Sequence, residues 1–316
     1  MTSAAIIMQI LFNGLMLGIQ YALIAVGFTL YFGVLDVINF SHGDVFMLGA
    51  FVALVLINIF GGLATTGGWY FLILIVVFLG TMFITGAIGV LFERVAVKPV
   101  SSAPSFMSLL ATLGLGIALR EAVRIFYPRG SESKRFPELF GPLFQSGERE
   151  AFEIGGVIIR YDNLLILGIG IALVILISLY INRTKMGLAI RAVAQDGEAA
   201  LMMGVNKNLV IDMTFLLGSA LAALAGMLNG LYYNTAIFDM GAMAGVIGFS
   251  AAVIGGLGNI YGAIVGGFLF ALTESFSAAF VPRGSEYMDV IAFGVVILFL
   301  VFRPSGILGE RMYERV

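Results

Sequence analysis

Long apolar runs with almost no charge are the feature that most restricts what this chain can fold into. No lysine or arginine precedes Arg94. A helix needs about 20 apolar residues to cross roughly 30 Å of hydrocarbon, and the chain contains eight runs near that length. These predicted spans cover residues 5–31, 45–60, 69–92, 104–119, 162–181, 209–232, 260–280 and 287–302. We therefore expect an all-α polytopic membrane protein with about eight transmembrane helices.

Composition supports a single membrane domain over residues 1–316. The chain is 60% hydrophobic and only 11% charged, whereas soluble domains are about a quarter charged. No basic segment precedes the first run, so we expect that run to remain as a span and not to be cleaved as a signal peptide. The absence of cysteine excludes disulfides, thiolate metal sites and cysteine nucleophiles. The net charge of -2 identifies no partner, and no nucleic acid is expected.

The polar connections define two faces. If every run crosses once, residues 93–103, 182–208 and the C-terminal tail share one face, and residues 120–160 lie on the other. Basic residues divide almost evenly between the faces, but several crowd the short 182–208 segment. We therefore place 182–208 in the cytoplasm and 120–160 outside as an external loop, with a short hairpin at FEIGGVIIRY.

A polar segment interrupts the apolar sequence after the first run, and it carries the only histidine of the chain. Such groups are costly in hydrocarbon, so they lie at an interface or line a polar cavity. Ser41 is expected to cap a helix whose first turn contains Asp44. One interpretation is a broken or re-entrant helix that lines a substrate pathway, and the other is an ordinary interfacial turn. The pathway residues predicted here are Asn39, Ser41, His42, Gly43 and Asp44.

A second polar break follows the run at 209–232, ahead of a short Gly-rich apolar stretch at 241–258. Asn229, Tyr233 and Asp239 are the candidate pathway residues, although Tyr at the end of a span is often an interfacial anchor. Glu274 is interpreted as lying near the outer interface, with hydrogen bonding between helices as the alternative.

The two breaks also suggest a repeat with units at 9–100 and 209–302. Five crossings separate the units, so the repeat would be inverted, as in many transporters. Similar composition is the alternative explanation of the likeness.

The residues of the first break do not predict an enzyme. Ser41, His42 and Asp44 are too close in sequence to form a nucleophile, base and orienting group on one frame. One histidine without cysteine does not supply a closed metal ligand set. A proton-coupled secondary transporter that uses His42 and Asp44 as a relay remains an alternative function.

The segment 182–208 contains two predicted short helices, separated near Asp196 and Gly197. Ala199, Ala200, Leu201 and Met203 of the second helix are expected to form a small-residue face able to enter a groove on another protein. Packing of the loop on its own membrane domain is the alternative.

Three pieces of the chain resemble the H-type (LivH-like) permease of branched-chain amino acid ABC importers. They are NGLMLGIQYALIAVGFTLYFGVLDVINFSHGDVFMLGAF, RTKMGLAIRAVAQDGEAALMMGVN and SAAVIGGLGNIYGAIVGGFLFALTESF, the last followed by FRPSGILG. They occur in the order and spacing of the family from Asn13 to Gly309. Relatives carry a lysine at the position of Ile247. They also carry a proline in the second break, where this chain has none. The solutes of the family include branched-chain and other amino acids, urea and short amides.

The resemblance implies a transport subunit that works by alternating access in the inner membrane of a bacterium. Its implied partners are a second homologous permease, two cytoplasmic ATPases and a periplasmic solute-binding protein. The chain itself would bind no cofactor, because ATP and Mg would be used by the ATPase subunits. The residues assigned to ATPase coupling are Arg191, Asp196, Glu198, Ala199, Ala200 and Gly204.

Overall fold

The computed structural model describes residues 3–60, 68–100, 103–137, 151–154 and 156–309. Within these ranges, eight helices are long and apolar enough to cross a membrane, which confirms the predicted all-α polytopic fold. They are α1 (Ser3–Leu35), α2 (His42–Ile59), α3 (Gly68–Phe92), α4 (Ser105–Phe126), α5 (Tyr161–Arg183), α8 (Lys207–Tyr233), α10 (Ile260–Phe280) and α11 (Gly284–Phe302). The ninth apolar run forms a shorter helix, α9 (Met240–Gly255).

The remaining elements are short connections. A π-helical turn, η1 (Glu93–Val97), and a 3-10 turn, η2 (Lys98–Val100), follow α3. The two short helices α6 (Lys185–Gln195) and α7 (Gly197–Met202) connect α5 to α8. Strands β2 (Ala151–Ile154) and β3 (Val157–Arg160) form the antiparallel hairpin that the sequence predicted. Strand β1 (Lys134–Arg135) pairs with β4 (Thr235–Ala236), and residues 138–150 of the predicted external loop lie outside the described residues.

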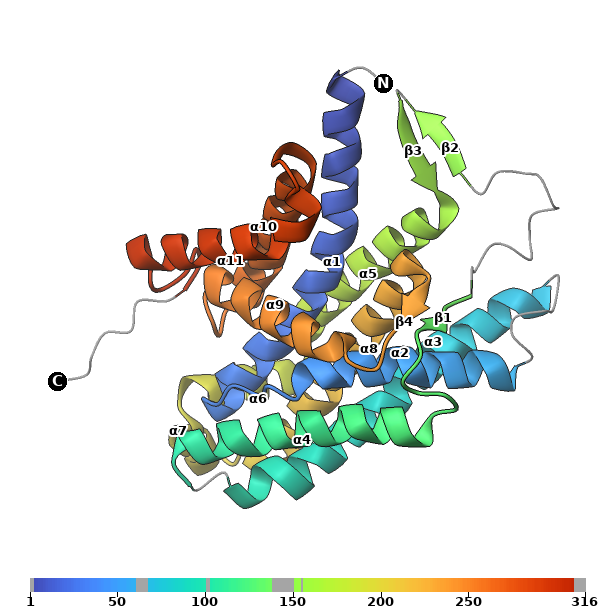
Figure 1. Ribbon diagram of the computed structural model, residues 1–316. Coiled ribbons are helices and arrows are strands. Elements are labelled where there is room, and N and C mark those ends of the chain that lie inside the picture. Colours follow the sequence, from blue (N-terminus) through green and yellow to red (C-terminus); the bar gives the residue numbers. More distant parts are fainter. Residues whose placement is uncertain (1–2, 61–67, 101–102, 138–150, 155, 310–316) are drawn as a thin grey trace.

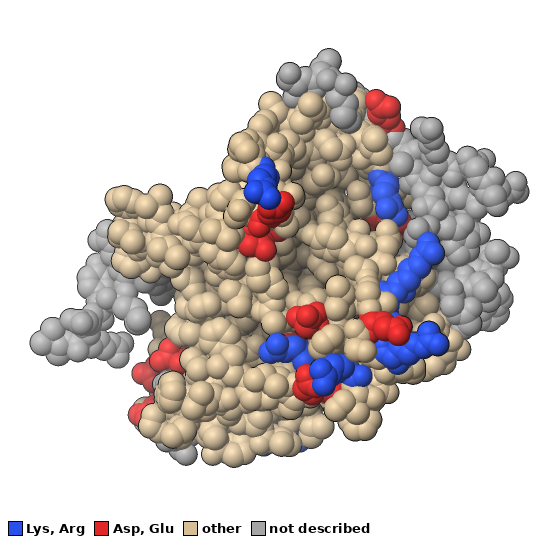
Figure 2. Space-filling view, in the orientation of Figure 1, with Lys and Arg blue, Asp and Glu red and all other residues tan. Residues whose placement is uncertain are grey.

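Helices α1, α2 and α8 form the core of the bundle. They are largely buried within the chain, whereas α5 and α11 expose most of their apolar surface, as helices that face lipid or another membrane subunit do. In Figure 1, α10 and α11 lie to the left of α1, α4 lies near the lower edge, and α3 runs from the right side toward that edge. The face drawn in Figure 2 carries few charges over most of its area, and several of its basic side chains lie beside acidic ones.

Two predicted boundaries are corrected by the structure. The fourth span does not end at residue 119, because α4 continues to Phe126. Arg120 and Arg124 therefore belong to a helix and not to the external loop. The second predicted span begins at residue 45, but α2 begins at His42, so the polar segment runs directly into the helix.

Candidate functional site in the polar break between α1 and α2

The chain reverses between α1 and α2 through a tight turn. Asp36 adopts a left-handed conformation with φ of 54° just after α1. Asn39 Oδ1 then accepts hydrogen bonds from Ser41 Oγ at 2.6 Å and from the Ser41 backbone N–H at 3.2 Å. Ser41 does precede the first residue of α2, as predicted, but its side chain makes no capping hydrogen bond. The hydroxyl group instead stabilises the turn.

The polar break lies beside the middle of α4. The backbone N–H of Phe40 donates to Thr112 Oγ1 at 3.3 Å, and a side chain at Gly116 would collide with the Asp44 carboxylate. Thr112, Gly116 and Arg120 are spaced four residues apart and share one face of α4. At 1.5 Å per residue, α4 is about 33 Å long, and these three residues occupy its central part. If α4 spans the membrane, the break lies well inside it.

Asp44 is compensated by an ion pair that the sequence did not predict. Arg120 Nε lies 2.9 Å from Asp44 Oδ1, and the two side chains are 27% and 4% exposed. A buried carboxylate without a partner would cost several kcal/mol. The missed signal was the helical spacing of Arg120 from Thr112 and Gly116, which continues the fourth span beyond its purely apolar part.

His42 fixes the start of α2 against α1. Its buried ring makes edge-to-face contacts with Phe28 and Tyr31, at centroid distances of 4.8 Å and 4.9 Å. Nε2 lies 3.2 Å from the Ile24 carbonyl oxygen, which can only accept, so Nε2 carries a proton. Gly27 makes room for the ring, since any side chain there would collide with it. His42 and Asp44 thus contact different helices.

The N-terminus of α9 meets that of α2 at the break. A side chain on Gly43 would collide with the Gly241 carbonyl oxygen, and a Cβ on Gly241 would lie 2.8 Å from Asp44 Oδ1. Asp239 precedes α9, is exposed and makes no capping hydrogen bond. The structure therefore brings Gly43 and Asp44 together with the first turns of α9, and the glycines allow the two backbones to approach.

Asn229 and Tyr233 lie near a second group of polar residues, which includes Gln20, Tyr21 and Glu274. Asn229 Nδ2 donates to Gln20 Oε1 at 3.0 Å, while Tyr233 is about half exposed and packs edge-to-face on Tyr232. Of the two interpretations of Glu274, the structure supports hydrogen bonding between helices, because Glu274 is buried and accepts a 2.8 Å hydrogen bond from Tyr21. Gln20 and Tyr21 were missed because both lie inside an otherwise apolar run.

The segment between α5 and α8 is well ordered by capping. Thr184 caps α6 by accepting from the Gly187 N–H at 3.0 Å. Asp196 Oδ1 caps α7 by accepting from the backbone N–H groups of Glu198 and Ala199 at 3.1 Å and 3.0 Å. These caps satisfy amide groups that a helix start leaves open.

The two faces of α7 differ. Ala200 is buried, Ala199 is partly buried, and Glu198 is exposed. Apolar side chains follow at the end of α7, where Leu201, Met202 and Met203 are 50%, 82% and 85% exposed.

Two other residues assigned to coupling support this segment. Arg191 is exposed and donates to Asn182 Oδ1 at 3.1 Å, which ties α6 to the end of α5. Gly204 has a φ of 84°, a conformation that favours glycine and turns the chain from α7 toward α8.

Comparison with known proteins places the chain in a family. Residues 10–300 match the family described as the branched-chain amino acid transport system / permease component. The chain is 38% identical over 311 residues to the high-affinity branched-chain amino acid transport system permease protein BraD of Pseudomonas aeruginosa, covering 98% of both chains. It is 36% identical over 309 residues to LivH of Escherichia coli K12, covering 98% of this chain and 97% of that protein.

A more distant relative carries the same system name. LivM of Salmonella typhimurium, also described as a permease protein of the high-affinity branched-chain amino acid transport system, is 24% identical over 312 residues. The match covers 91% of this chain and 67% of LivM. The match over nearly the whole chain, together with the eight apolar helices, shows that this protein belongs to the family of membrane permease components of branched-chain amino acid transport systems.

Proposed function

We propose that this chain is one permease subunit of an ATP-driven importer for branched-chain amino acids. The observation that carries the proposal is the capped pair α6–α7, which ends in exposed Leu201, Met202 and Met203. Exposed apolar side chains on an ordered helix are typical of a protein contact. In this proposal α7 contacts a cytoplasmic ATPase, and Glu198 lies at the polar edge of that contact.

The partners follow from the same proposal. Both LivH and LivM are described as permease proteins of one type of transport system, which supports a second, homologous permease subunit beside this one. Two ATPase subunits would use ATP and Mg on the cytoplasmic side, and this chain would bind no cofactor. A periplasmic binding protein would deliver the solute to the outer face, which places the assembly in a bacterial inner membrane.

The proposed pathway passes the polar break at the start of α2. Two helix N-termini meet there, those of α2 and α9, and helix N-termini present backbone N–H groups that favour anionic groups. A solute carboxylate would bind backbone N–H groups at these helix N-termini, near Arg120 and Gly43. In an alternating cycle, the solute would pass this region when the permeases open first outward and then inward.

We also propose that the two halves of the chain form an inverted repeat. The contact of α1 with α10 corresponds to the contact of α8 with α3. The contact of α2 with α8 likewise corresponds to the contact of α9 with α1. Exchanging α1 with α8, α2 with α9 and α3 with α10 thus preserves the main contacts. This exchange supports the repeat units 9–100 and 209–302.

The proton-coupled alternative has less support. A relay would need His42 and Asp44 to exchange a proton, but Asp44 pairs with Arg120 and the His42 ring packs against α1. That function predicts uptake driven by a proton gradient without ATP. Uptake into proteoliposomes with ATP and a proton ionophore separates the two functions.

Variants of α7 test the proposed function. The chain is purified with its companion subunits, and Glu198→Arg and Gly204→Trp are compared with Glu153→Arg, a substitution on the exposed side of the β2–β3 hairpin. We expect the two α7 variants to lose ATPase association and ATP-dependent leucine uptake, with ATPase association intact in the control. Normal association and uptake in well-expressed α7 variants would show that the coupling assignment is wrong.

A further inference from the structure

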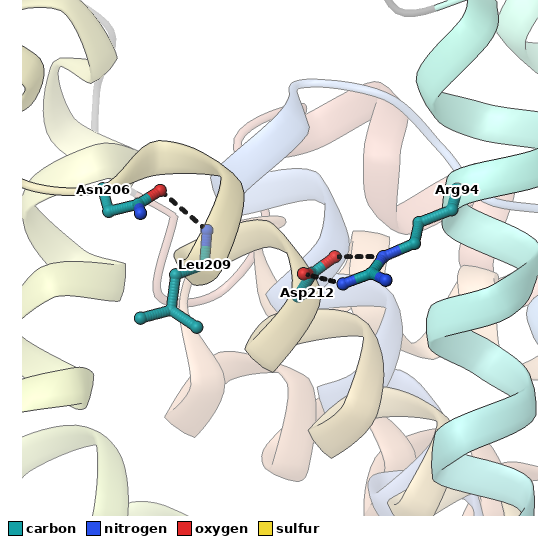
Figure 3. Close-up of polar contacts among 4 residues, drawn as sticks. All are labelled: Arg94, Asn206, Leu209 and Asp212. Atoms are coloured by element: carbon teal, nitrogen blue, oxygen red, sulfur yellow. Dashed lines mark hydrogen bonds and ion pairs between the residues drawn. The ribbon is translucent and has the colours of Figure 1, made fainter.

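A paired contact joins the end of α3 to the start of α8. Arg94, in the η1 turn, places Nη2 2.6 Å from Asp212 Oδ2 and Nε 3.4 Å from Asp212 Oδ1 (Figure 3). Two N–H groups of one guanidinium facing both oxygens of a carboxylate fix direction as well as distance. The contact therefore restrains how α8 is placed along α3.

The surroundings of this pair are unusual for a surface contact. The π-helical turn that carries Arg94 widens the backbone at the end of α3, a feature often found at functional positions. Glu93 is buried next to Arg94 and interacts electrostatically with Asp212, with Lys98 and, more weakly, with Arg94. The pair of Arg94 and Asp212 therefore lies beside a buried acidic side chain.

Helix α8 is joined tightly to α7. The Val205 N–H donates to the Ala200 carbonyl at 3.0 Å, and the Gly204 N–H donates to the Leu201 carbonyl at 2.9 Å. Asn206 Oδ1 then caps α8 by accepting from the Leu209 N–H at 3.1 Å (Figure 3). Because these bonds leave no loose linker, a displacement of α7 displaces the first turns of α8.

Beyond Asp212, the same side of α8 leads to the polar break. Ser219 lies so close to Gly89 of α3 that a side chain at Gly89 would collide with it. The Ser219 hydroxyl is 3.0 Å from Tyr31 OH, and Phe215 stacks on the Tyr31 ring at 4.6 Å. Tyr31 in turn packs against His42. Asp212, Phe215 and Ser219 follow helical spacing.

We propose that Arg94 and Asp212 are positioning residues of the transport cycle. By holding α8 on α3, they transmit a displacement of α7 to Tyr31 and His42. Without the pair, α8 would slide along α3 and the displacement would not reach these residues. This inference rests on the proposed function, since it requires that an ATPase moves α7.

The test measures leucine transported per ATP hydrolysed by the complete complex in proteoliposomes. The variants are Arg94→Gln, Asp212→Asn and the double exchange Arg94→Asp with Asp212→Arg. Each single variant is expected to lower the ratio about fivefold or more, the usual range of coupling between sites, and the exchange is expected to restore much of it. Arg94 is 59% exposed but Asp212 only 18%, so loss of the arginine leaves a partly desolvated carboxylate, and the ratio is measured well below the melting temperature of every variant complex.

A second arginine–carboxylate pair, on the surface, serves as the control. Arg283 Nε lies 3.3 Å from Glu286 Oε2 at the start of α11, with both side chains more than half exposed. Arg283→Gln should leave the leucine-to-ATP ratio unchanged. An unchanged ratio in Arg94→Gln, an exchange as poor as the single variants, or an equal loss in Arg283→Gln would overturn the inference. A wild-type complex without ATP-dependent uptake would instead refute the proposed function.

Discussion

At the residue scale, the pair of Asp44 and Arg120 explains how charge is tolerated in the centre of the bundle. Asp44 is almost fully buried, whereas the Arg120 side chain remains about a quarter exposed. Asp44 therefore depends on the ion pair for its stability more than Arg120 does. A carboxylate left alone in this position has no access to water, while the guanidinium retains some.

This asymmetry predicts unequal effects of neutralising the two residues. Arg120→Gln leaves a buried, unpaired carboxylate and should destabilise the protein by about 3 kcal/mol. Asp44→Asn leaves a partly solvated arginine and should cost less, and the double variant should resemble Asp44→Asn. Thermal unfolding in detergent measures the order.

A surface pair provides the control for this order. Arg124 and Glu121 form an ion pair on α4 with both side chains nearly half exposed, so Arg124→Gln should change stability by less than about 1 kcal/mol. If Asp44→Asn were more destabilising than Arg120→Gln, the account of Asp44 as the dependent partner would be wrong.

The contact of Asp44 with Arg120 could be predicted from the sequence only in part. The polar segment from Asn39 to Asp44 was visible because polar residues interrupt an apolar run. Its partner was not, because Arg120 follows a separate run and the rotation of α4 about its axis depends on packing. The two interpretations of Glu274 could not be separated for the same reason, since only the fold shows that it faces Tyr21.

At the scale of elements, the crossing of α2 and α8 is set by glycine. A side chain on Gly226 would collide with the Phe46 carbonyl oxygen, and a side chain on Gly49 would collide with the backbone of Ala223. Without a hydrophobic drive between helices in lipid, such close backbone contact provides much of the association. The helix that begins at the polar break, α2, and the helix that follows the proposed ATPase contact, α8, are thereby held together.

The crossing predicts opposite effects for two glycine variants. Gly226→Ala should destabilise by about 1–3 kcal/mol, because the new methyl group has no space. Gly168→Ala, on the exposed side of α5 with no neighbour within 4 Å, should be neutral or slightly stabilising, since alanine favours helix over glycine. Melting temperatures of the two variants would be compared, and equal losses would contradict the role of the crossing.

The elements themselves were largely predictable from sequence. Apolar runs located all eight spans, because a membrane helix must satisfy its own backbone and be long enough to cross. A predicted span ended too early where a charged residue lies inside a helix that continues, as at Arg120 in α4. The short α9 was visible as an apolar stretch, but its approach to Gly43 depends on tertiary contacts between halves of the chain.

At the scale of the whole molecule, the proposed alternating access requires that the buried break become accessible during transport. In this structure Asn39, Ser41 and His42 are buried. Their burial describes a closed arrangement of the chain by itself. If the break lines the proposed pathway, water must reach it in another arrangement of the complex.

Because this chain contains no cysteine, an introduced thiol is its only thiol, and the change is read from the labelling of this chain after the subunits are separated. Ser41→Cys should react slowly with a membrane-impermeant maleimide in the resting complex and several times faster during turnover with ATP, leucine and the binding protein, since only a hydrated thiol forms the reactive thiolate. Thr81→Cys, equally buried on α3, should stay protected in both conditions. Equal increases at both positions would indicate general loosening, and no increase at Ser41→Cys would exclude the break from the pathway. A selective increase would connect the local turn between α1 and α2 to the motion of the whole transporter.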